Sequence, residues 1–352
     1  APPPTPPPSP AATAGATAAV ALSAVTESSA WAIAPPQYAR GVVGGKSANL
    51  ARLGEVASAV GAALGMDVRV PPSVALPFGA FERALAAPEN ALAAALLNDA
   101  LVDLERGAAA AASREATLDA LEAAREAVES LAMPAGLAEE VASVAAAAGV
   151  GARAQGDEAG DEPAWWPEVL RVWASKWTER AHASRAALGL PESELRMGVL
   201  IMDVVPADYA FVLHSRDPTR ADAPRGSAMG EVVVGLGETL VGNHPGRALR
   251  FAAGAPGACA SLLALPSKLE TMRAGAPGAL ICRSDSNGED LENFAGAGLY
   301  DSHITEDGVV HTFTDYAHER LLWDAPFGEA IGGGGAARPP PRGGSVVLQF
   351  FD

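Results

Sequence analysis

The stretch GALICRSDSNGED, residues 278–290, passes from an apolar run to a polar one within a few positions. The run ALIC has the composition of a buried strand, and the polar residues after it are typical of a turn and a helix start. Ser286 and Glu289 have the spacing of a capping box, so helix capping accounts for both. Arg283 and Asp285 follow the expected end of the strand, where functional groups commonly lie in alternating folds. Arg283 could grip a phosphate with two parallel hydrogen bonds, or it could form a structural ion pair with a nearby acid.

Strand and helix patterns alternate before this stretch. Residues 231–242, EVVVGLGETLVG, have the pattern of a buried strand followed by a glycine turn and a helix. Residues 197–215 contain two apolar runs around Pro-Ala-Asp and predict an antiparallel pair. The alanine-rich residues 91–150 predict two or three helices. The sequence therefore predicts a mixed α/β (α+β) fold with active groups at strand ends.

Composition divides the chain into three parts. Residues 1–29, rich in proline and alanine, are expected to form a disordered linker. Residues 30–310 carry the strand and helix patterns, with a helical insertion at about 88–190. Residues 311–352 form a low-complexity tail in which these patterns fade, and we expect this tail to be truncated or altered.

Charge and composition exclude several classes of function. The net charge of −17 argues against nucleic acid or an anionic membrane surface as the main partner. Two cysteines in 352 residues support neither a disulfide framework nor a four-ligand zinc site, and they indicate a reducing compartment. The sequence contains no uninterrupted apolar run of about eighteen residues, so it predicts no transmembrane helix. The six histidines have no metal-ligand spacing and form no recognisable catalytic triad.

The motif GGKS, Gly44 to Ser47, is similar to a phosphate-binding loop, but its glycine spacing does not match the Walker pattern. The physical logic of such a loop still applies. Gly44 and Gly45 let the backbone approach a ligand, the following helix start offers free N–H groups, and Lys46 supplies a positive charge. The alternative interpretation is an ordinary helix N-terminus, with Ser47 near the cap and an exposed lysine.

Two further motifs have both a functional and a structural interpretation. Glu238 in GLGE follows a predicted buried strand and lies between glycines, which suits a carboxylate facing Mg²⁺. A tight turn with an exposed acid is the alternative. Trp173 and Trp177 have helical spacing, and we interpret them as core residues rather than as a platform for stacking sugars.

Several long blocks resemble a known family. In order along the chain they are GGKSANLARL, PPSVALPFGAFERAL, VWASKWTERA, ADYAFVLHS, GEVVVGLGETLVGNHPGRAL and RSDSNGEDLENFAGAGLYDS. Together, over residues 31–302, they resemble the C-terminal nucleotide-binding region of the α-glucan, water dikinase family. The pyruvate, phosphate dikinase and phosphoenolpyruvate synthase families share the ATP-grasp-like fold, but their arginine-serine block precedes the tryptophan helix. Here Arg283 follows GLGE, an order that favours the glucan enzymes.

The resemblance implies an ATP-grasp-like domain, within residues 30–310, that binds ATP and Mg²⁺ in a chloroplast enzyme of starch metabolism. In the family, the β-phosphate of ATP passes to a histidine and then to a glucosyl hydroxyl, and the γ-phosphate passes to water. Onto this chain the resemblance places Lys46 and Arg283 as catalytic phosphate ligands and Glu238 as a metal or ribose-side carboxylate. It also assigns Gly44, Gly45 and Asp285 to the nucleotide site, and Met202 and Asp203 to the adenine hinge.

Two features of the family have no counterpart here. The phosphohistidine motif matches none of the histidines and is expected in a separate domain upstream of Ala1. The closing strand of the family is absent, although VVLQ at residues 346–349 has a similar beginning. We therefore expect that this chain alone does not phosphorylate glucan, which would bind through other parts of the protein. The alternatives are a non-catalytic remnant that serves as a scaffold or glucan-docking module, and the ATP-binding domain of a pyruvate-type phosphotransferase.

Overall fold

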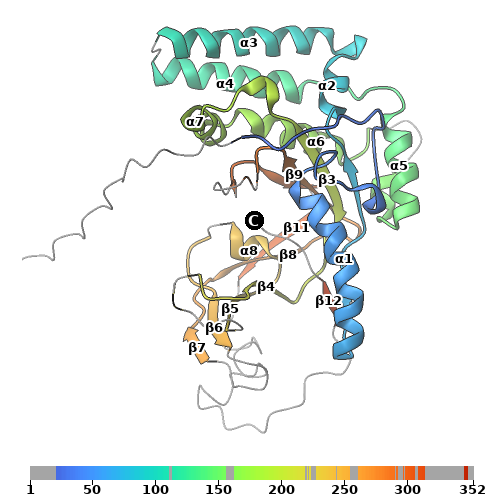
Figure 1. Ribbon diagram of the computed structural model, residues 1–352, viewed down its shortest axis with the longest axis vertical. Coiled ribbons are helices and arrows are strands. Elements are labelled where there is room, and N and C mark those ends of the chain that lie inside the picture. Colours follow the sequence, from blue (N-terminus) through green and yellow to red (C-terminus); the bar gives the residue numbers. More distant parts are fainter. Residues whose placement is uncertain are drawn as a thin grey trace, which may run out of the picture.

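The computed structural model combines helices with sheets of mostly antiparallel strands, so the predicted mixed α/β class is confirmed (Figure 1). The structure describes residues 21–110, 113–155, 162–218, 220, 222, 227–242, 244–253, 261–289, 291, 296, 298–305, 308–313 and 345–347. The helices are α1 (Gly45–Leu64), α2 (Ala80–Leu85), α3 (Ala91–Ala110), α4 (Arg114–Glu129), α5 (Leu137–Ala148), α6 (Trp166–Ala174), α7 (Glu179–Leu188) and α8 (Glu238–Val241). None of these helices is both long and apolar enough to cross a bilayer.

The strands form two four-stranded antiparallel sheets and two smaller pairs among the described residues. The first sheet has the order β10-β9-β3-β2, and the second sheet has the order β4-β5-β6-β7. Strands β11 and β8 pair antiparallel, and β1 and β12 pair parallel. The strands are β1 (Asp67–Arg69), β2 (Ser73–Leu76), β3 (Met197–Asp203), β4 (Tyr209–His214), β5 (Ala228–Val234), β6 (Leu249–Ala253), β7 (Ser261–Ala264), β8 (Glu270–Ala274), β9 (Leu280–Ser286), β10 (Ser302–Ile304), β11 (Val309–Phe313) and β12 (Ser345–Val347).

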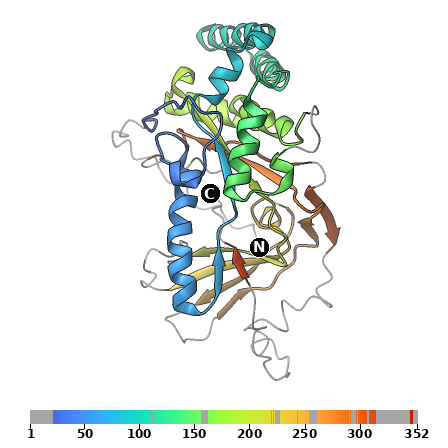
Figure 2. The same cartoon turned by 90° about the vertical axis from the view of Figure 1, so that its right-hand side faces the viewer.

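The two central strands of the first sheet, β3 and β9, are buried on both faces. Successive side chains of a strand point to opposite faces, and along β3 Val199 and Ile201 join the core beneath helices α2 to α7. Leu200 and Met202 join a second, smaller core with Leu50 of α1. The continuous apolar run of β3 is therefore explained by burial between two layers. Figure 2 shows α1 running along the side of the molecule, with the helical layer at one end.

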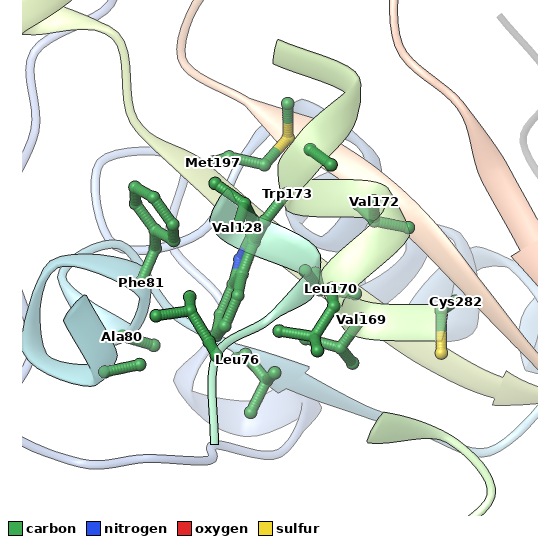
Figure 3. Packing of buried hydrophobic residues seen from close by; sticks show 14 of the residues in the cluster. Leu76, Ala80, Phe81, Val128, Val169, Leu170, Val172, Trp173, Met197 and Cys282 are labelled. Carbon is green, nitrogen blue, oxygen red and sulfur yellow. The ribbon is translucent and has the colours of Figure 1, made fainter. Parts of the chain in front are cut away.

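The helical layer is built around tryptophans, as their helical spacing predicts. Trp173 of α6 is fully buried, with its ring centroid 5.3 Å from that of Phe81 and 5.6 Å from that of Trp166. Trp177 lies 6.0 Å from Phe81 and is also buried. Figure 3 shows Phe81 and Leu76 close to the Trp173 side chain. Tilted and edge-on aromatic pairs of this kind add to the free energy of burial, and the interpretation of both tryptophans as core residues is confirmed.

The predicted antiparallel pair around Pro-Ala-Asp is wrong. β3 pairs with β2 and β9 in the first sheet, whereas β4 pairs with β5 in the second sheet. Residues 204–208 connect the two sheets, and Pro206 between the two strands has no N–H to donate to a ladder. The two apolar runs also differ in burial, because β3 is buried on both faces and β4 alternates. The segment is therefore a crossing between sheets.

The strand that begins ALIC continues further than its composition predicts. β9 extends through the polar residues to Ser286, so Arg283 and Asp285 lie within the strand and not beyond its end. Arg283 stands opposite Leu200 of β3, and Asp285 stands opposite Gly198, so ladder pairing with β3 holds these residues extended. No helix begins among the described residues between Asn287 and Leu291, although Glu289 does accept a bond from the Ser286 N–H at 3.2 Å.

The structure describes residues 21–29, the last part of the segment expected to form a disordered linker. The N–H groups of Ser23, Thr26 and Ser28 donate to backbone carbonyls of the folded chain at 3.0, 2.6 and 3.1 Å. These bonds fix residues 21–29 against the body of the protein, because each satisfies a backbone donor that a linker would leave in water. Residues 1–20, and the predicted tail apart from 311–313 and 345–347, lie outside the described residues.

Candidate functional site

Lys46 lies in the first turn of α1 and is buried, with 6% of its surface exposed. Its Nζ lies 3.0 Å from both carboxylate oxygens of Glu289 and 3.3 Å from Oγ of Ser284. The alternative interpretation of Lys46 as an exposed lysine is therefore wrong. Moving an ammonium out of water is costly, and the fold tolerates it here because a buried carboxylate and a hydroxyl surround the charge.

Asp285 closes the N-terminus of α1. Its carboxylate accepts the Lys46 N–H at 2.8 Å and the Ser47 N–H at 2.9 Å. A carboxylate in this position satisfies helix donors that lack an intrahelical partner and lies at the positive end of the helix dipole. The prediction that the helix start offers free N–H groups is wrong for these two residues, because Asp285 already binds them.

Gly44 permits this close contact. A Cβ atom at residue 44 would lie 2.0 Å from Oδ1 of Asp285, a separation that no side chain could tolerate. Gly44 was predicted to let the backbone approach a ligand. In the structure it lets the backbone approach the carboxylate of Asp285. Gly45 begins α1 beside it and is buried.

The pKa of Asp285 is raised, mainly because burial disfavours its charged form. The hydrogen bonds from Ser47 and Lys46 and the charge of Lys46 oppose this rise. Desolvation raises the pKa of this carboxyl group and the donors of α1 lower it. Its proton affinity therefore depends on whether α1 stays docked on β9.

Asp285→Asn is expected to change the pH dependence of stability. Because the folded-state pKa is raised above its usual 3.8, the native chain holds the proton at pH values where the unfolded chain has lost it. The free energy of unfolding of the wild type, relative to that of the variant, should therefore fall as pH rises from 3.8 through the raised pKa. Urea titrations of dilute protein at several pH values, followed by tryptophan fluorescence, measure this difference. A difference that stays constant with pH would contradict the account.

Arg283 shares this region of β9 and is buried, with 6% of its surface exposed. It lies two residues from Asp285 and two from Ile281, so the three side chains share one face of the strand. Ile281 packs in the small core with Leu50 of α1, which identifies this face as the one that α1 covers. The structure therefore brings Arg283, Asp285 and Lys46 to the same layer, between the first sheet and the start of α1.

Met202 and Asp203 end β3, where the chain leaves the first sheet. Met202 is buried in the small core. Asp203 is half-buried and accepts the Gly151 N–H at 2.9 and 3.2 Å, and burial raises its pKa against the effect of this bond. Asp203 thus fixes the loop after α5, so its carboxylate has a structural partner in addition to any role beside a nucleotide.

Glu238 is the first residue of α8, which follows β5 of the second sheet. It is half-exposed, while its neighbour Thr239 is buried and accepts the Met272 N–H at 2.9 Å. In Figure 1, α8 lies on the side of the second sheet that faces the first sheet. Within the described part of the chain, no three His, Cys, Asp or Glu side chains are grouped to hold a metal ion. Glu238 thus follows a strand of the second sheet, whereas Arg283 and Asp285 lie on the first sheet and Lys46 lies on helix α1.

Sequence reasoning missed two partners of Lys46. Glu289 had been explained as a capping residue, and Ser284 had been given no role, yet both side chains reach Nζ of Lys46. The available signal was the density of polar groups in RSDSNGE, which exceeds what one helix cap requires. The positions that pair are 238 to 243 residues apart, so no local pattern could connect them.

Comparisons with known proteins place these residues in context. Residues 158–247 match the family described as pyruvate phosphate dikinase, AMP/ATP-binding domain. The chain is similar to chloroplastic alpha-glucan water dikinase 1 of Arabidopsis thaliana, with 39% identity over 305 residues that cover 84% of this chain and 20% of the relative. It is 39% identical over 313 residues to the chloroplastic enzyme of Solanum tuberosum, covering 86% and 19%, and 36% identical over 266 residues to alpha-glucan water dikinase 2 of Arabidopsis thaliana, covering 74% and 19%. The chain thus spans about a fifth of the length of these relatives.

Proposed function

We propose that this chain, which is homologous over most of its length to one region of the α-glucan water dikinases, is the ATP-binding part of a dikinase that phosphorylates glucan. The observation that carries the proposal is the buried cluster of Lys46, Arg283 and Asp285 at the start of α1. A buried lysine at a helix N-terminus and a buried arginine on the neighbouring strand β9 have the chemistry that binds the phosphates of a nucleotide.

Binding would require an exchange of partners at Lys46. In the unliganded chain Glu289 neutralises the ammonium at 3.0 Å. A phosphate oxygen carries the same sign of charge and could replace this carboxylate without leaving a buried ammonium unpaired. Arg283 would then contact the phosphates from β9 and stabilise the charge that spreads over their oxygens during transfer.

The arrangement of the two sheets supports an ATP-grasp-like assignment. The chain passes from the first sheet to the second at residues 204–208, directly after Met202 and Asp203. The apolar side chain of Met202 at such a crossing suits the flat, apolar face of an adenine. Residues 158–247, which match the AMP/ATP-binding family, contain this crossing together with β4, β5 and α8.

Mg²⁺ fits this site as a partner of the nucleotide rather than as an ion held by the protein alone. Mg²⁺ usually binds phosphate oxygens, waters and one or two carboxylates. The described residues supply no cluster of three acids, and Glu238 is half-exposed, so Glu238 would provide a single carboxylate beside the phosphates. The ion would supply neutralising charge on the phosphates, while Lys46 and Arg283 hold them in place.

The complete reaction would need other parts of a longer protein. The β-phosphate would pass to a histidine outside this chain and then to a glucan hydroxyl, and the γ-phosphate would pass to water. The residues of this chain would bind and orient ATP. The names of two of the relatives describe them as chloroplastic, which supports a chloroplast location for this protein.

One observation favours a second candidate, a non-catalytic domain that keeps the fold as a scaffold or glucan-docking module. Both the Lys46 ammonium and the N–H groups of Lys46 and Ser47 have partners from β9 and the turn after it, so these groups are satisfied without a ligand. A pyruvate-type phosphotransferase, the other alternative, has less support because the three relatives described above are glucan dikinases.

ATP is expected to stabilise the folded chain. A ligand that binds only the native state at about 100 times its Kd adds about 2.7 kcal/mol to the free energy of unfolding, so Tm should rise with the concentration of Mg-ATP. Thermal unfolding with Mg-ATP, Mg-GTP and no nucleotide measures this effect. If Mg-ATP leaves Tm unchanged and glucan raises it, the result would contradict nucleotide binding and support the glucan-docking function.

A further inference from the structure

A second cluster of cations lies on the second sheet. A pocket of about 450 Å³ opens beside the last turn of α8, and its lining includes Arg247, Arg250, Lys268, His244 and Glu231. Three permanent cations thus face one carboxylate among the described lining residues, in a chain whose net charge is −17. None of these residues belongs to the nucleotide site proposed above.

The backbone fixes two of the cations next to each other. The carbonyl of Arg247 accepts the N–H groups of Ser267 and Lys268 at 2.8 and 3.3 Å, and Oγ of Ser267 accepts the Arg247 N–H at 3.0 Å. Gly246 has φ of 97°, and a Cβ there would lie 2.6 Å from the Ser267 carbonyl. The position of Arg247 therefore depends on main-chain contacts and not on its own side chain, which is exposed at the pocket.

Two of the three cations have described partners of known geometry. Arg250 lies opposite Glu231 in the β5–β6 ladder, and Nε of Arg250 is 2.9 Å from the Glu231 carboxylate. Lys268 is 6% exposed, and its ammonium donates to the carbonyl of His244. The described lining thus brings three permanent cations close together, and an anion bound there would reduce the repulsion among them.

We propose that this pocket binds a phosphate group. Guanidinium groups offer planar pairs of donors that match phosphate oxygens, and a lysine adds a third charge. The volume is within the usual range for small-molecule sites, so the phosphate could be free or attached to a sugar or nucleoside. Orthophosphate, a sugar phosphate monoester and a nucleoside monophosphate share the chemistry that the pocket recognises. The proposal goes beyond ATP binding and does not depend on it.

Arg247→Gln tests the proposal by calorimetric titration of the full chain with orthophosphate. Loss of a hydrogen bond to a charged group is expected to weaken binding about tenfold. Arg106→Gln, at an exposed arginine of α3 paired with Asp103, is the matched control and should leave the affinity unchanged. Equal affinity in the wild type and Arg247→Gln, or no binding of orthophosphate, glucose 6-phosphate or AMP at millimolar concentration, overturns the proposal.

Glu231→Gln gives a test that misfolding cannot imitate. Removing the carboxylate from the pocket should tighten orthophosphate binding several-fold, because a like charge no longer opposes the anion. An unchanged or weaker affinity contradicts the proposal.

The same titrations on Lys46→Ala separate this pocket from the nucleotide site. Phosphate binding that survives Lys46→Ala and is weakened by Arg247→Gln supports the pocket even if ATP does not bind at all. Phosphate binding that is lost in Lys46→Ala and kept in Arg247→Gln belongs to the nucleotide site and overturns the pocket. Among orthophosphate, glucose 6-phosphate and AMP, the compound with the tightest binding that depends on Arg247 identifies the source of the phosphate.

Discussion

Lys46→Ala and Arg283→Ala are each expected to weaken the binding of Mg-ATP by at least about tenfold. Each substitution removes a buried cation, and a hydrogen bond to a charged group contributes about 1.5–3 kcal/mol, which corresponds to about a ten- to hundredfold change in Kd. Both residues are 6% exposed, so little water screens their charges. Calorimetric titration of each variant with Mg-ATP measures the loss.

Two further variants show whether the loss comes from the contacts or from damage to the fold. Arg106→Ala removes an exposed arginine of α3 and should leave the affinity unchanged. Lys46→Ala leaves Glu289 without the ammonium that binds it, so Lys46→Met with Glu289→Gln removes both charges together. The double variant should keep its stability and still bind Mg-ATP weakly. Wild-type affinity in the double variant would remove Lys46 from the proposed site.

Trp173→Ala is expected to lower the free energy of unfolding by about 3–5 kcal/mol, the usual range for truncating a buried aromatic residue. Trp173 has no exposed surface, and its ring contacts those of Phe81 and Trp166. Because it lies in the core between the helical layer and the first sheet, the cavity left by the substitution would loosen the sheet that carries Arg283. Urea unfolding followed by circular dichroism measures the change.

The matched control for this core prediction is Leu92→Ala. Leu92 is 74% exposed on α3, so its truncation should change the free energy of unfolding by no more than about 0.5 kcal/mol. Trp173→Phe keeps an aromatic ring in the core and should fall between the two. Similar losses for Trp173→Ala and Leu92→Ala would show that the packing around Trp173 contributes little to stability.

Local patterns predicted the elements of the fold better than their pairing. The glycine turn before α1, the strand before α8 and the buried tryptophans were all visible in composition and spacing. The pairing of β3 could not be predicted from composition and spacing. Two apolar runs separated by a turn fit a hairpin, but they also fit a chain that crosses between two sheets. The partners of β3 are set by tertiary contacts, which strand propensity alone does not predict.

The site depends on contacts between distant parts of the sequence. Asp285 caps a helix by accepting the N–H of Lys46, 239 residues earlier, and this use of its carboxylate leaves no trace in the residues around it. Lys46 was predicted to be a phosphate ligand from its place after two glycines, but its burial and its carboxylate partner follow from the docking of α1 on β9. The role of Glu289 was misassigned because its spacing from Ser286 also fits a helix cap.

The measurement that tests the account most directly is calorimetric titration of the wild-type chain and Arg283→Ala with Mg-ATP and, separately, with adenosine. If Arg283 binds the phosphates, the variant should lose at least about tenfold in affinity for Mg-ATP and keep its affinity for adenosine, which has no phosphate. Equal affinity of both proteins for Mg-ATP, with the variant folded, would contradict the claim that the cluster at the start of α1 binds the phosphates of ATP.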